Sequence, residues 1–210
     1  MNHTTTAPSL LKCLRSLRPS RSLEPGEQLR VAELQASRLR DLAVAGAGED
    51  IQWEAIISGQ PRVEIVYETL PVSGSSHWNG EKWIICLNRS DSMVRQRFTL
   101  LHEWKHIVDH GAIGRPVGDQ AEHLADYFAG CVLIPKTALK RAWTQGIQKP
   151  EALAEHFGVS EQAICVRLSQ TGLDRAIDRV PTPRCARPVS TPRWQTQRFQ
   201  PAHRSRRYAA

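Results

Sequence analysis

The chain has 210 residues, of which 40% are hydrophobic and six are Trp, so it can form one full domain with extra segments. No apolar run approaches the length that crosses a membrane, and no secretory apolar stretch lies near the start. The five Cys are scattered and form no C-x-x-C pair, which argues against a disulfide framework or a thiolate zinc site. We therefore expect a soluble, cytoplasmic protein that has no membrane contact.

The formal net charge of +7 is concentrated at one end of the chain. Residues 1–173 are neutral overall, whereas residues 174–210 contain nine Arg, two Asp and five Pro. The basic isoelectric point therefore describes a tail and not a basic folded surface. We expect this Arg/Pro-rich tail to be disordered, with weak nonspecific attraction to nucleic acid.

The N-terminal segment, residues 1–23, contains basic residues but no acidic residue. Its leucines could form one face of a short basic helix, as in an organelle transit peptide, but the simpler expectation is a disordered basic extension. Residues 24–45 then show helical periodicity, and residues 51–58 predict a second, short helix.

The hydrophobic period changes to two after this helical region. Residues 63–67 read as a strand, and residues 76–78 and 82–87 read as two strands joined at Asn79-Gly80, a strong hairpin signal. We expect a small antiparallel sheet, with an edge strand that could hold an extended substrate by main-chain pairing.

The sequence His102-Glu103-Trp104-Lys105-His106 has the form H-E-x-x-H. Residues four apart share one face of a helix, so the two histidines can bind one ion. In zinc hydrolases the glutamate of this motif takes a proton from water at the metal. We interpret His102 and His106 as metal ligands and Glu103 as the general base.

The motif lies in a predicted helix that begins after Asp91 or Ser92 and ends at Gly111. Apolar residues recur at helical spacing around the motif, so the helix can belong to a core. The structural alternative is a buried helix that happens to carry two histidines and a glutamate. Such a helix would need partners for three ionisable side chains, which favours the metal interpretation.

A catalytic zinc usually has three protein ligands. His110 is eight residues from His102, about 12 Å along a helix, so the two cannot share one ion with His106 between them. The next predicted helix, residues 119–133, offers Glu122 as the third ligand, with His123 as a competitor. Asp126, four residues later on the same face, resembles the carboxylate that orients a ligand histidine in thermolysin-like zinc peptidases. The alternative is that Glu122 and Asp126 are ordinary surface charges on an amphipathic helix.

Several blocks of sequence together resemble the ImmA/IrrE family of metallopeptidases. Residues 97–106 resemble its R-F-T-x-x-H-E-x-x-H motif, and residues 85–88 resemble its strand that ends in Asn. Residues 122–129 resemble E-x-x-A-N-x-F-A, and residues 132–135 resemble an apolar run that ends in Pro. Asp126 departs from the usual Asn, and Trp104-Lys105 replaces a small or apolar pair.

The resemblance implies an intracellular endopeptidase, and it supports the metal and base assignments made above. Some members of the family cleave a helix-turn-helix repressor that is often encoded beside them. We expect one zinc ion per chain, with manganese as the alternative, and a repressor of this kind as substrate. The donor that stabilises the oxyanion is not identified by the sequence, and Tyr127 and His77 are guesses.

Residues 150–168 read as helix, Gly-containing turn, Ser cap and second helix, which is helix-turn-helix-like. The second helix offers only Gln162, Arg167 and Gln170 for reading bases, so packing on the peptidase domain is the preferred interpretation. We expect an α+β fold with a disordered extension (1–23), a metallopeptidase domain (24–145), the helical pair (146–173) and a disordered tail (174–210).

Two other function classes compete with the peptidase interpretation. One is a non-enzymatic DNA-binding regulator that uses the helical pair and the Arg-rich tail. The other is a toxin-like member of a two-gene module, in which the fold binds a partner without cleaving it. A repressor gene beside this one would favour the peptidase or the toxin-like alternative.

Overall fold

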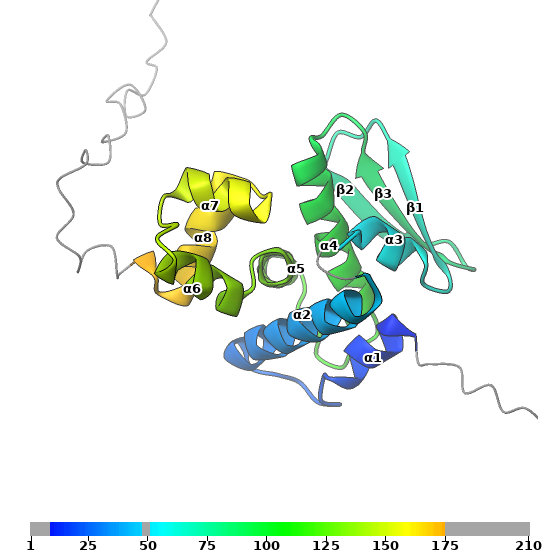
Figure 1. Cartoon of the computed structure of the whole chain (residues 1–210). Helices are drawn as coiled ribbons and strands as arrows, with labels where there is room; N and C mark the ends of the chain where they lie inside the picture. The colour runs from blue at the N-terminus through cyan, green and yellow to red at the C-terminus, as the bar shows by residue number, and fades with distance from the viewer. Residues whose placement is uncertain (1–8, 48–50, 175–210) are drawn as a thin grey trace, which may run out of the picture. The chain divides into compact units, whose positions relative to one another are not determined.

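The computed structural model describes residues 9–47 and 51–174, and the expected C-terminal tail lies almost entirely outside them. This part of the chain has an α+β fold of eight helices and three strands (Figure 1). The elements are α1 (Leu10–Ser16), α2 (Pro25–Ala47), α3 (Trp53–Ser58), β1 (Val63–Glu68), β2 (Gly74–Trp78), β3 (Trp83–Asn88), α4 (Met93–Asp109), α5 (Asp119–Leu133), α6 (Lys136–Thr144), α7 (Pro150–Phe157) and α8 (Glu161–Thr171).

The sheet is mixed, in the order β1-β3-β2, so the expectation of an antiparallel sheet is only partly correct. The predicted hairpin pairs β2 with β3 antiparallel, but β1 pairs with β3 in parallel. The most apolar strand, β3, takes the centre and buries Ile85, Cys86 and Leu87. The polar strand β2 takes an edge, because its side chains tolerate solvent.

Gly74 allows the edge strand β2 to lie close to helix α4. A Cβ atom at Gly74 would lie 2.5 Å from Cγ2 of Thr99 on α4 and 2.9 Å from the carbonyl oxygen of Cys86. Any larger residue would push the strand away from the helix, so this glycine sets the spacing between them.

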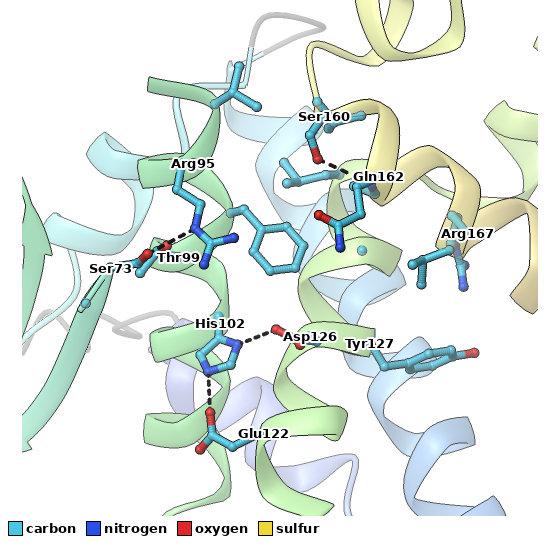
Figure 2. A pocket seen from close by; sticks show the side chains of 18 of the residues that line it. Ser73, Arg95, Thr99, His102, Glu122, Asp126, Tyr127, Ser160, Gln162 and Arg167 are labelled. Atoms are coloured by element: carbon cyan, nitrogen blue, oxygen red, sulfur yellow. Dashed lines mark hydrogen bonds and ion pairs between the residues drawn. The ribbon is translucent and has the colours of Figure 1, made fainter. Parts of the chain in front are cut away.

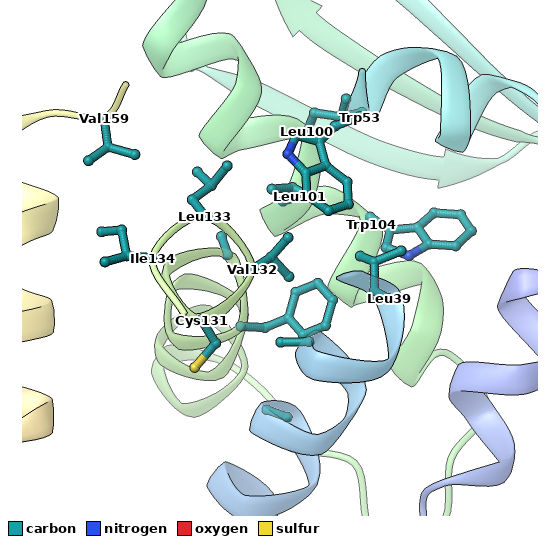
Figure 3. Close-up of a cluster of buried hydrophobic side chains, with 14 of the residues drawn as sticks. Leu39, Trp53, Leu100, Leu101, Trp104, Cys131, Val132, Leu133, Ile134 and Val159 are labelled. Carbon is teal, nitrogen blue, oxygen red and sulfur yellow. The ribbon is translucent and has the colours of Figure 1, made fainter. Parts of the chain in front are cut away.

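Helix α4 begins at the predicted cap, since the Ser92 side chain accepts a hydrogen bond from the backbone N–H of Arg95. Its apolar side faces the centre of the fold and buries Leu101, Trp104 and Ile107 completely. Helix α5 lies centrally, with α2 and α4 on one side and α6–α8 on the other (Figure 1). Side chains of α2, α3, α4 and α5 meet in one apolar cluster (Figure 3).

Lys105, one of the two departures inside the motif, is buried on the core side of α4. Its ammonium group donates hydrogen bonds to Oε1 of Gln35 at 2.8 Å and to Oδ1 of Asp109 at 2.7 Å. A buried charge is tolerated when it is paired and hydrogen-bonded in this way. The motif helix is thereby joined to α2, because the lysine points to the core side of α4.

The expectation that residues 1–23 are disordered is wrong for residues 9–23. Helix α1 buries Leu10 and Leu14 in the main core, because its leucines do form one apolar face. Arg15 donates hydrogen bonds to the carbonyl oxygens of Ile107 at 2.7 Å and Val108 at 3.2 Å. These carbonyls end helix α4, so α1 caps the helix that carries the motif.

Candidate metal centre

Two helices bring together the three side chains that were predicted to bind metal. His102 and His106 lie one turn apart on α4, and Glu122 comes from the first turn of α5. One donor atom from each of the three lies within 4.8 Å of the others. Among the described residues, no other group of three or more His, Cys, Asp or Glu side chains brings its donor atoms this close together.

The separations within this cluster fit a small tetrahedral ion. Nε2 of His102 lies 3.0 Å from Nε2 of His106 and 3.1 Å from Oε2 of Glu122. Nε2 of His106 lies 3.5 Å from Oε1 of Glu122. Ligand atoms placed about 2.0–2.1 Å from a tetrahedral zinc would be roughly 3.4 Å apart. Two imidazoles and one carboxylate are also a known ligand set for catalytic zinc.

The carboxylate of Asp126 lies where it can orient the His102 ring. Nδ1 of His102 lies 2.8 Å from Oδ1 of Asp126, so an Nδ1–H that donates to this carboxylate leaves Nε2 free to bind metal (Figure 2). Burial alone would lower the pKa of His102, but Asp126, with Glu103 and Glu122, raises it overall. The pKa of His106 is lowered by burial and by its neighbour His102. The carboxylates of Asp126, Glu103 and Glu122 therefore place negative charge around His102.

Glu103 is buried beside the cluster, with a side chain that contacts the sheet. Its Oε2 accepts a hydrogen bond of 2.7 Å from Oγ of Ser76 on the edge strand β2. Glu103 does not belong to the group of three side chains that could hold an ion. Ser76 was not identified from the sequence, because nothing in a Gly-Ser-Ser strand indicates which serine faces the motif.

The remaining candidates lie outside the ligand set. His110 ends helix α4 and contacts the ring of Trp83 at a centroid distance of 4.8 Å. His123 is exposed and lines the cleft described below. The hydroxyl of Tyr127 donates to Oε2 of Glu33 at 3.3 Å, so it points away from His102 (Figure 2). His77 is exposed on β2. No oxyanion donor is assigned among the described residues.

The cluster lies in a cleft with a volume of about 940 Å³. The loop before β2, helix α4 and helix α5 form its sides, and the far side is formed by α8 and the turn before it. Arg95 and Gln162 extend from opposite sides toward the space above His102 (Figure 2). The sequence did not predict that the helical pair contributes to this cleft, since that depends on how α5 and α8 pack.

A comparison with protein families matches residues 61–169 to the IrrE N-terminal-like domain of the M78 peptidases. The matched region contains the H-E-x-x-H motif and Glu122, and it spans just over half of the chain. The chain belongs to the M78 peptidase family. This confirms the resemblance to ImmA/IrrE proteins and points to a metallopeptidase.

Among solved structures, this M78 family member is similar to a protein described as a Mycobacterium tuberculosis transcriptional regulator. The TM-score is 0.53 at 18% identity, over 77% of this chain and 52% of that one. The chain thus spans about half the length of that regulator, and the likeness concerns the fold. No curated protein gives a significant match. None of the helices in the described residues has the length and hydropathy to cross a bilayer.

Proposed function

We propose that this protein is a zinc-dependent endopeptidase that hydrolyses a peptide bond in a protein partner. The observation that carries the proposal is the convergence of His102, His106 and Glu122 on one point, with the buried carboxylate of Glu103 beside them. His102, His106 and Glu122 would hold the ion, for which manganese is the alternative. Asp126 would orient His102.

A divalent ion held there would supply a Lewis acid that polarises the peptide carbonyl and makes water easier to deprotonate. Glu103 accepts the proton of the attacking water and delivers it to the leaving amine. The hydrogen bond from Ser76 keeps the Glu103 carboxylate in one position for both transfers. The edge of β2 can align an extended substrate by main-chain pairing.

The expected partner is a helix-turn-helix transcriptional repressor encoded nearby, in the cytoplasm, whose cleavage would relieve repression. Support for a regulatory partner comes from family membership and from the fold shared with a described transcriptional regulator. The DNA-binding alternative is disfavoured by α8. Arg167, the only basic residue of α8, is buried and donates to the carbonyl oxygen of Ile134 at 3.0 Å, so it cannot reach a phosphate or a base.

The decisive experiment compares the wild-type protein with Glu103→Gln. Both full-length proteins are purified, their zinc and manganese contents are measured by elemental analysis, and each is mixed with the neighbouring repressor. The proposal expects equal metal content and a loss of cleavage on the order of 10²–10⁴ or larger for Glu103→Gln. Glu155→Gln changes an exposed carboxylate on α7 in the same way and serves as the matched control.

A reporter under the repressor tests the same point in cells. Relief of repression should be lost with Glu103→Gln and retained with Glu155→Gln. Equal output from wild type and Glu103→Gln, with both proteins folded and metal-loaded, would exclude cleavage as the cause. It would favour the non-enzymatic or toxin-like alternative.

A further inference from the structure

The far side of the cleft is formed by the helical pair that resembles a DNA-binding motif. Five residues of α8 line it, namely Gln162, Ala163, Val166, Arg167 and Gln170. Val166 is 50% exposed, although it is a large apolar side chain on a packed helix. An apolar side chain left accessible inside a cleft is a common feature of a binding site.

The helical pair is fixed in this position by buried contacts. Leu153, Ile164 and Leu168 belong to the same apolar core as helices α4 and α5. The guanidinium of Arg97 on α4 donates to the carbonyl oxygen of Gly158 in the turn between α7 and α8. The cleft therefore has a preformed far wall.

The opposite wall, on α4, combines an apolar surface with a free positive charge. Val94 and Phe98 precede His102 at intervals of four residues and line the cleft. Arg95 is exposed, and its Nε donates to Oγ of Ser73 at 3.0 Å. Among the described residues, no carboxylate forms an ion pair with Arg95. A ligand can supply that carboxylate.

We infer that the α4–α8 cleft selects an extended substrate segment that carries a large apolar side chain followed, farther from the scissile bond, by an acidic one. The apolar side chain lies between Phe98 and Val166, and the acidic one pairs with Arg95. The inference rests on the proposed function, because the scissile bond must lie at the metal cluster. It makes α8 a substrate-recognition helix.

The geometry of helix α4 determines how far the substrate's apolar and acidic residues lie from the scissile bond. Phe98 lies four residues before His102, about 6 Å along the helix axis, and Arg95 lies seven residues before it, about 10 Å. An extended peptide advances about 3.3 Å per residue. The apolar residue should therefore lie about two residues from the scissile bond, and the acidic residue about three.

Peptide hydroxamates test this spacing, because the hydroxamate binds a metal ion and sets the register. The probes are Glu-Leu-Ala-hydroxamate, the same peptide with Gln for Glu or Ser for Leu, and acetohydroxamate as the anchor alone. A second series carries the hydroxamate at the other end, with the residue order reversed. Binding to the metal-loaded full chain is measured by calorimetry.

In one of the two series, replacing Glu by Gln should weaken binding about threefold to fivefold. Replacing Leu by Ser should weaken it about tenfold. Arg95→Gln should remove the preference for Glu, and Arg95→Glu should reverse it in favour of a Lys-Leu-Ala probe. Val166→Asp should remove the preference for Leu. Arg38→Gln and Val44→Asp, which alter exposed residues on α2, should leave both preferences unchanged.

The outcomes distinguish this inference from the proposed function. Binding of acetohydroxamate without any preference for Leu or Glu would overturn the inference and leave the peptidase proposal intact. A full chain that takes up neither zinc nor manganese, and then fails to bind acetohydroxamate, would overturn both. If Val166→Asp weakened retention on duplex DNA and left all hydroxamate affinities unchanged, α8 would be a nucleic-acid surface and the inference would be wrong.

Discussion

Ser76 and Glu103 are joined by a hydrogen bond of 2.7 Å between Oγ and Oε2, which links the edge strand β2 to the helix of the metal centre. The strand that can align a substrate thus also holds the carboxylate proposed to move protons. Ser76→Ala should retain metal and stability and reduce kcat by about tenfold, because an unanchored carboxylate spends less time in the productive position. Steady-state kinetics with the repressor as substrate measures this loss of kcat. Ser75→Ala, an exposed neighbour on the same strand, is the control, and equal kcat values for the two variants would contradict the role of Ser76.

The ligand set predicts which side chains retain the metal. Glu122→Ala should lose most of the bound ion, since it removes one of the three proposed ligands, whereas His110→Ala should retain it. Elemental analysis of the purified variants gives the answer. Full occupancy in Glu122→Ala would show that another side chain, with His123 the first candidate, binds the ion.

Asp126 should influence metal affinity without binding the ion. Asp126→Ala leaves Nδ1 of His102 without its acceptor, so we expect affinity to fall about 10–100-fold. Asp126→Asn keeps an oxygen acceptor and should lose less. Competition with a chromophoric chelator measures both constants. Identical affinities for wild type and Asp126→Ala would mean that the contact does not orient the imidazole.

Helix α1 should contribute to stability, in contrast to a disordered extension. Leu14 is fully buried in the core, and Leu14→Ala should lower the free energy of unfolding by about 2–5 kcal/mol. Leu34→Ala, at a side chain that is 52% exposed, should change it by less than about 0.5 kcal/mol. Urea denaturation followed by circular dichroism compares the two. Equal midpoints would show that α1 does not pack in solution.

The cysteines should differ in reactivity with pH. Burial raises the pKa of Cys131 to about 11, so at pH 8 nearly all of it is the unreactive thiol. Cys165 is exposed on α8 and should react with iodoacetamide at least about tenfold faster. Mass spectrometry of the labelled peptides over time gives both rates, and the rate at Cys131 should rise as pH approaches 11. Equal rates at pH 8 would indicate that α5 opens readily.

The family, the metal helix and the ligand candidates could be predicted from the sequence, because they depend on local geometry. The spacing of His102 and His106 places both on one helical face wherever that helix lies. Glu122 and Asp126 share a face of the next helix for the same reason. The hairpin at Asn79-Gly80 is equally local, since the turn residues determine it.

The tertiary structure decided the features that depend on contacts between distant segments. Strand β1 pairs in parallel with β3, since strand order depends on which apolar faces meet and not on the period of each strand. Ser76 contacts Glu103 across 27 residues, and Lys105 contacts Gln35 across 70. Contacts between distant segments also decide whether the leucines of residues 9–23 pack in the core. They decide likewise whether α8 faces DNA or the cleft. An amphipathic pattern specifies that a face will be buried, but only the assembled core specifies against what.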